Sequence, residues 1–151
     1  MMAANTVRSG LAVVAVALAF CLAGCFGGTT ASDKEARLTA ALESAGGGVV
    51  GAKVVTTPSA AGGLTVTVKL SSDGVEPGGR EVAAETLTRI LTVTADNAAD
   101  MRVTSLYLYA DDEGGDDLSF HDAAAKLGLQ DSVNGDSLTL IAEDWTSYAG
   151  K

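Results

Sequence analysis

Apolar and polar residues alternate strictly in LTVTVKL, residues 64–70, which places the apolar positions on one side of an extended chain and the threonines and Lys69 on the other. This pattern is typical of an antiparallel strand with one face in water. The β-branched run VVGAKVVTT, residues 49–57, precedes it, and PSAAGG between them has the composition and length of a hairpin turn. The sequence therefore predicts two adjacent strands joined by a hairpin.

Helical periodicity flanks this hairpin on both sides. SDKE, residues 32–35, has the form of a capping box, and small and apolar residues follow at helical spacing until the glycine triplet at 46–48. After the hairpin, a stretch that starts near Arg80 places Leu87 and Ile90 on one face and charged residues on another. We expect one helix before the two strands and a stronger amphipathic helix after them.

The chain beyond residue 100 begins with MRVTSLYLYA, residues 101–110, where apolar and aromatic residues occur on both faces of an extended chain. This run predicts a third strand that is central in the sheet or covered on both sides. A short helix is expected over residues 120–127, and Asn134-Gly135 is typical of a tight turn. The last segment, SLTLIAEDWTSYAG, fits both a strand and a helix, and a short strand that passes into a final helical turn is favoured.

The order helix-strand-strand-helix-strand over residues 32–110 predicts an α+β fold, a two-layer sandwich with a mainly antiparallel sheet and a short C-terminal extension of strand and helix. Residues 32–151 are expected to form a single domain. In its order of elements, the chain resembles BON-type envelope modules and other small periplasmic sandwiches. The resemblance rests on that order rather than on a motif, and it implies lipid binding only by analogy.

The N-terminal segment has the pattern of an export signal. Residues 1–9 carry a single charge, Arg8, and residues 10–23 contain no polar side chain. An apolar helix of about 14 residues spans only about 21 Å, which is less than the roughly 30 Å of a bilayer core. The basic start, the short apolar middle and the small residues at the end predict a secretory signal.

This signal ends in Leu22-Ala23-Gly24-Cys25, which resembles the lipobox of bacterial lipoproteins at every position. The resemblance implies cleavage before Cys25 and a diacylglycerol thioether on its sulfur. Residues 1–24 are then the signal peptide and residues 25–31 a tether, and lipid holds the exported protein on the outer face of the bacterial cell membrane. Two acyl chains anchor a protein stably where one does not. The alternatives are an uncleaved membrane anchor, or a secretory signal in which Cys25 is incidental.

The charge of the chain excludes one class of partner. The 151 residues include 10 basic and 19 acidic side chains, a net charge of −9, and loss of Arg8 with the signal leaves 9 basic residues and a charge of −10. A body with this charge lacks the clustered Lys and Arg that nucleic acid requires. Anionic headgroups would also repel it, so the tether is expected to supply the membrane affinity.

Cysteine and histidine content limits the chemistry further. Cys21 leaves with the signal and Cys25 takes the lipid, so the processed domain would contain no thiol. Such a domain forms no disulfide, thiolate zinc site or cysteine nucleophile. His121 is the only histidine, and no nucleophile motif accompanies it. We therefore predict no catalytic residue, no cofactor and no enzymatic activity.

Acidic residues are densest in DDEGGDD, and oxygen-rich clusters of this kind suit calcium. The segment lacks the alternating ligand spacing and the distant glutamate of an EF-hand loop, so a solvated loop is favoured over a metal site. The weak calcium candidates are Asp111, Asp112, Glu113, Asp116 and Asp117.

Four aromatic residues are candidates for an exposed contact patch or a ligand pocket, although aromatics at these spacings also suit a core. They are Tyr107, Tyr109, Trp145 and Tyr148. The threonine face of residues 64–70 is a further candidate, because it would pair with a partner's strand if its own strand lay at an edge. A solvent-facing sheet is the favoured interpretation of that face.

Together these patterns favour a lipid-anchored, non-catalytic protein of the bacterial envelope whose α+β domain binds another envelope component, in particular a protein. The alternative is a carrier or sensor that holds a small hydrophobic or lipid ligand between sheet and helices. An enzyme would have to rely on carboxylates alone. An enclosed apolar cavity would favour the carrier, whereas a packed core with an exposed aromatic patch would favour the binding module.

Overall fold

The computed structural model describes residues 29–58 and 61–151. The predicted signal peptide, Cys25 and most of the predicted tether lie outside these residues. None of the described helices has the length and apolar character needed to cross a membrane.

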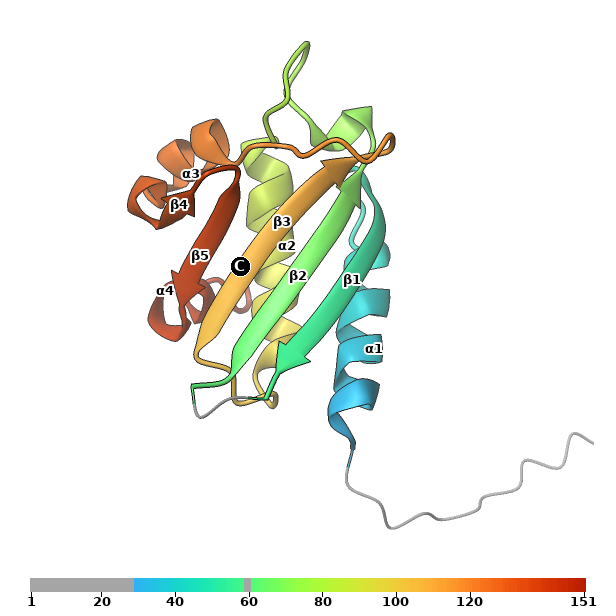
Figure 1. Ribbon diagram of the computed structural model, residues 1–151, viewed down its shortest axis with the longest axis vertical. Coiled ribbons are helices and arrows are strands. Elements are labelled where there is room, and N and C mark those ends of the chain that lie inside the picture. The colour runs from blue at the N-terminus through green and yellow to red at the C-terminus, as the bar shows by residue number, and fades with distance from the viewer. Residues whose placement is uncertain (1–28, 59–60) are drawn as a thin grey trace, which may run out of the picture.

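The described chain alternates helices and strands in an α+β arrangement, as predicted, and Figure 1 shows their positions. The helices are α1 Ala31–Glu43, α2 Ala84–Ala98, α3 His121–Leu127 and α4 Ala142–Thr146, with short 3-10 turns at Ser72–Gly74 and Gln130–Ser132. The strands are β1 Val49–Thr57, β2 Gly63–Leu70, β3 Ser105–Asp112, β4 Val133–Asn134 and β5 Ser137–Ile141.

The five strands form one sheet in the order β1-β2-β3-β5-β4. Three of the neighbouring pairs are antiparallel, which confirms the mainly antiparallel prediction, and β2 and β3 run parallel. The parallel pair follows from connectivity, because α2 joins these two strands as a crossover on one face of the sheet. Figure 1 shows α1 and α2 behind the sheet, and no helix of the described residues covers the front face.

The core lies between this sheet and the helices. Every second residue of the central strands faces this core. The alternating apolar residues of β2 are therefore the buried ones. Full burial of one leucine or valine side chain contributes about 1.5–3 kcal/mol. The side chains with no exposed surface include Leu38, Leu42, Leu64, Val66, Val68, Leu87, Ile90, Leu91, Leu106, Leu108, Leu138 and Leu140.

The start of α1 differs from the sequence prediction. A capping box forms between Thr30 and Asp33, two residues before the expected pair, Ser32 and Glu35. Both pairs have suitable spacing, but Glu35 is occupied by hydrogen bonds from Thr56 of β1. A contact with a distant strand therefore decides where the helix begins.

Two other elements begin later in the structure than the sequence predicts. The helix expected near Arg80 begins at Ala84, because Val82 lies in an extended segment where its N–H donates to the carbonyl of Ser119 at 2.9 Å. The third strand begins at Ser105 rather than Met101. The C-terminal prediction is confirmed, since β5 passes directly into α4.

Candidate functional site

The front face of the sheet is a surface built by strand alternation. On this face, which is the one without helices, each side chain of β3 has a neighbour on β2, on β5 or on both. The neighbouring side chains form rows that run across the strands. One row consists of Val55, Thr65, Tyr107 and Thr139. The next contains Lys53, Thr67 and Tyr109. Two tyrosines on a central strand are thus bordered by threonine hydroxyls.

The side chains of Tyr107 and Tyr109 are 38% and 44% exposed. Leu106, which precedes them, and Leu108, which lies between them, are fully buried. The sequence predicts a strand that is either central or covered on both sides, and the first alternative holds because β3 lies between β2 and β5. Among the described residues, helices pack on one face of the sheet only. Tyrosine tolerates the open face because its hydroxyl stays in contact with water.

Tyr107 also lies close to a glycine of the neighbouring strand. Its Cε2 atom is 3.3 Å from the position that a Cβ of Gly63 would take. A larger residue at position 63 would push the ring away from the sheet. The absence of a side chain at Gly63 therefore helps to hold one tyrosine ring against the open face.

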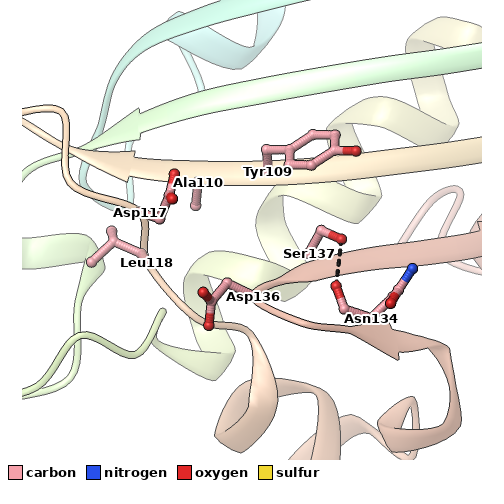
Figure 2. A pocket seen from close by; sticks show the side chains of 7 residues that line it. All are labelled: Tyr109, Ala110, Asp117, Leu118, Asn134, Asp136 and Ser137. Carbon is pink, nitrogen blue, oxygen red and sulfur yellow. Dashed lines mark hydrogen bonds between the residues drawn. The ribbon is translucent and has the colours of Figure 1, made fainter.

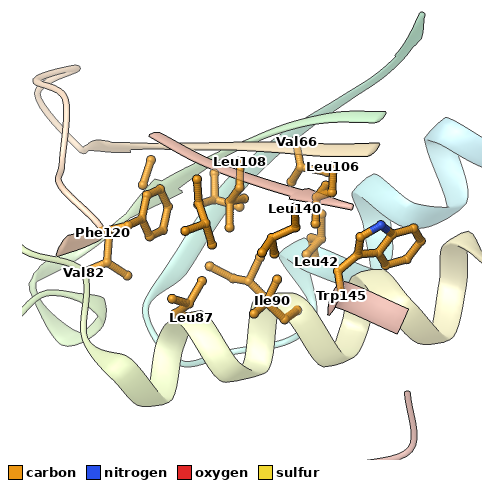
Figure 3. Packing of buried hydrophobic residues seen from close by; sticks show 14 of the residues in the cluster. Leu42, Val66, Val82, Leu87, Ile90, Leu106, Leu108, Phe120, Leu140 and Trp145 are labelled. Carbon is orange, nitrogen blue, oxygen red and sulfur yellow. The ribbon is translucent and has the colours of Figure 1, made fainter. Parts of the chain in front are cut away.

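The other two aromatic candidates lie on the helix side of the sheet. Trp145 is only 1% exposed and packs in the core near Ile90 of α2 and Leu42 of α1, as Figure 3 shows. Tyr148 is half-buried against the same core, its ring centre 4.7 Å from the Nζ atom of Lys151. Partial burial raises the pKa of the Tyr148 hydroxyl above its ordinary value of 10.0. The four aromatic residues therefore do not form one patch.

A hollow adjoins Tyr109 at the β4–β5 side of the open face (Figure 2). It has a volume of about 320 Å³ and opens to solvent. Asp117 enters from the loop after β3 and Asp136 from the turn before β5, while Ser137 donates a hydrogen bond to the carbonyl of Asn134 at 2.8 Å. Sequence reasoning missed Asn134, Asp136 and Ser137, because only the pairing of β5 with β3 brings them beside Tyr109.

The acidic segment forms a turn. Asp112 accepts a hydrogen bond from the backbone N–H of Asp116 at 2.9 Å, and this bond, helped by the N–H groups of Gly114 and Gly115, holds the pKa of Asp112 below its ordinary value. Within residues 29–58 and 61–151, no group of three or more His, Cys, Asp or Glu side chains is placed to hold a metal ion. The five acidic residues therefore gain no support as calcium ligands.

The remaining sequence candidates, His121 and the threonine face, have no partner arrangement that suggests a site within the described residues. His121 is exposed at the first position of α3, where its backbone N–H donates to the hydroxyl of Ser119 at 3.2 Å. The threonine face belongs to β2, which lies between β1 and β3 rather than at an edge, so the condition for strand pairing through β2 is not met. At the edge strand β1, carboxylates of Glu35 and Glu43 from α1 already accept backbone N–H groups.

Comparison with known proteins gives no match: no family model, no curated protein and no solved structure is similar to this chain.

Proposed function

We propose that this protein is a lipid-anchored, non-catalytic component of the bacterial envelope that binds a partner protein through the open face of its sheet. One observation carries the proposal: Tyr107 and Tyr109 are exposed side by side on a central strand, while the opposite face of the same sheet is buried in the core. Exposed aromatic rings on a rigid strand make effective contact residues because little side-chain entropy is lost on binding.

The anchor part of the proposal rests on the lipobox-like residues 22–25. A short tether would keep the domain near the bilayer, since six extended residues reach at most about 20 Å. Lipid attachment supplies the membrane affinity that the acidic body does not provide.

A carrier of a hydrophobic ligand is the less favoured alternative. Such a carrier would hold its ligand between sheet and helices, and that space is filled by the side chains of Leu87, Ile90, Leu108 and their neighbours (Figure 3). The hollows at the surface, of about 320 to 540 Å³, open to solvent. Packing of this kind supports an interaction module over a carrier.

Photo-cross-linking in native envelopes tests the binding face. A photoreactive phenylalanine analogue replaces Tyr107, and a matched control replaces Glu85, an exposed residue of α2 on the other side of the molecule. We expect a discrete protein adduct from position 107 that disappears in the Tyr109→Ser background. The same adducts from both positions would refute a specific face, and adducts with lipid alone would favour the carrier.

The anchor has its own test. Cys25→Ser should abolish both lipid attachment and the cleavage before residue 25, as judged by the loss of incorporated labelled fatty acid and by the larger size of the chain. Unchanged size and unchanged fatty-acid labelling would refute the lipid anchor without bearing on the cross-linking result.

A further inference from the structure

The corner of the domain where the tether would arrive contains a second hollow. It lies between the start of α1, the end of β1 and the loop before β3, and has a volume of about 540 Å³. Volumes of this order suit small-molecule groups. Its lining combines apolar and cationic side chains, including Ala31, Pro58, Met101, Val103, Lys34 and Arg102.

The loop before β3 is held in a costly conformation. Arg102 has φ +54°, the only positive value among the described non-glycine residues. Such a backbone costs about 1–3 kcal/mol and persists only where the surroundings impose it. Here Gly62 packs on the loop: a Cβ on Gly62 would lie 3.1 Å from the Arg102 carbonyl oxygen, and the N–H of Thr104 donates to the Gly62 carbonyl at 3.0 Å.

The carboxylates of this corner already have partners. Asp33 binds the cap residue Thr30, and the bond from the Thr30 hydroxyl is 2.7 Å long. Asp100 accepts from Arg37 at 2.7 Å and lies 3.7 Å from the Lys34 ammonium. Glu35, two residues after Asp33 in α1, accepts a hydrogen bond from the backbone N–H of Thr56.

Arg102 differs from these groups. It is exposed, and in the part of the chain that the structure describes no carboxylate lies within 4.0 Å of its guanidinium. The guanidinium of Arg102 is therefore the cationic group at this corner that remains available to an incoming anion, although the whole chain has a net charge of −9. The opposite end of the sheet carries the five acidic residues of segment 111–117.

We propose that this hollow receives the phosphate headgroup of an anionic phospholipid, so that the domain docks on the bilayer by its tethered corner. The inference rests on the lipid anchor of the proposed function, because residues 25–30 are too few to let the corner move far from the headgroups. A guanidinium binds phosphate oxygens through two parallel hydrogen bonds. Repulsion by the same bilayer keeps the acidic end outward, which leaves the Tyr107 face free for a partner.

The test uses the lipidated chain, purified from bacterial membranes and reconstituted into vesicles of phosphatidylcholine with or without phosphatidylglycerol. Pro58→Cys, at the hollow, and Val50→Cys, near the other end of β1 and 51% exposed, each receive one environment-sensitive fluorophore. Lipids that carry a quencher near the headgroup should quench the label at position 58 in anionic vesicles and leave the label at position 50 unquenched.

Two charge variants locate the interaction. Arg102→Gln should lower the docked-to-undocked ratio, read from quenching at position 58, by about fivefold, which corresponds to one arginine near an anionic surface. Arg80→Gln removes the same charge from an exposed arginine that does not line this hollow, and should leave the ratio unchanged. Equal quenching at positions 58 and 50, or equal effects of the two variants, would overturn the proposal.

Two further outcomes separate a failure of the lipid assignment from a failure of the anchor. If inorganic phosphate binds in an Arg102-dependent manner while the label at position 58 stays unquenched in anionic vesicles, the hollow is a site for free phosphate and the lipid assignment is wrong. If the chain does not float with vesicles at all, the anchor fails and the docking fails with it. The cross-linking result at Tyr107 does not depend on either outcome.

Discussion

Glu35 of α1 accepts two hydrogen bonds from Thr56 of the edge strand β1, one from the backbone N–H at 2.6 Å and one from the hydroxyl. Further along the same helix, Glu43 accepts from the N–H of Ala52 at 3.3 Å. The two carboxylates occupy backbone donors that an exposed edge would otherwise offer to another strand. A partner is therefore directed to the side chains of the open face rather than to the edge of β1.

Glu35→Gln should lower the free energy of unfolding by about 1 kcal/mol at neutral pH, because a charged acceptor binds more strongly than a neutral one and this pair lies near the surface. The Thr56 hydroxyl and backbone N–H hold the pKa of Glu35 below its ordinary value of 4.5. This stabilisation is fully present above pH 4.5 and is lost as the pH falls through the lower, folded-state pKa.

Urea unfolding of wild type and variant across this pH range checks the effect. The difference in stability between them should shrink steadily as the pH drops below 4.5. Glu113→Gln removes an exposed carboxylate from the acidic turn and serves as the control. A stability difference for Glu35→Gln that stays constant with pH would show that the ionised carboxylate is not the acceptor.

The glycine triplet offers a second test. Gly48 has φ +85°, and a Cβ there would lie 2.2 Å from the backbone nitrogen of Gly74, so Gly48→Ala should cost about 3–5 kcal/mol through combined strain and overlap. Gly46 also has a positive φ, +70°, but nothing lies within 4 Å of a Cβ, and Gly46→Ala should cost only about 1–2 kcal/mol. Similar midpoints for both variants in urea unfolding would contradict the close approach at Gly74.

Trp145 should behave as a core residue. Trp145→Ala is expected to lower the free energy of unfolding by about 3–5 kcal/mol, the usual cost of removing a buried aromatic side chain. Tyr148→Ala, from the same C-terminal segment but half-buried, should cost clearly less. Equal losses for both variants in chemical denaturation would place Trp145 outside the core.

Tyr107 and Tyr109 should matter for binding more than for folding. The double variant Tyr107→Ser/Tyr109→Ser is expected to weaken partner capture by at least about 30-fold, the effect of removing a contact of about 2 kcal/mol. Its stability should change by no more than about 1 kcal/mol per position, because both rings are exposed. Val50→Ser, another exposed apolar residue, is the matched control. Unchanged capture by the double variant would argue against the open face.

The sequence alone determined the type of most elements, because periodicity is a local property. The alternation in residues 64–70 predicted the strand β2, and the apolar stripe through Leu87 and Ile90 predicted a helix that corresponds to α2. Gly128 ends α3, as predicted, in a left-handed conformation with φ 74°. Each of these signals is complete within one short window of chain, so no knowledge of the neighbours was needed.

Only the tertiary structure decided how these elements meet. The parallel pairing of β2 with β3 depends on their becoming neighbours across the α2 crossover. The open face in front of Tyr107 and the burial of Trp145 depend on which side of the sheet the helices occupy. The same holds for Arg102 and Gly62, which are distant in sequence and come together only because β2 and β3 are neighbours. Contacts between distant segments carry no periodic signal along the chain, so side-chain pattern alone could not distinguish an exposed aromatic row from a buried one.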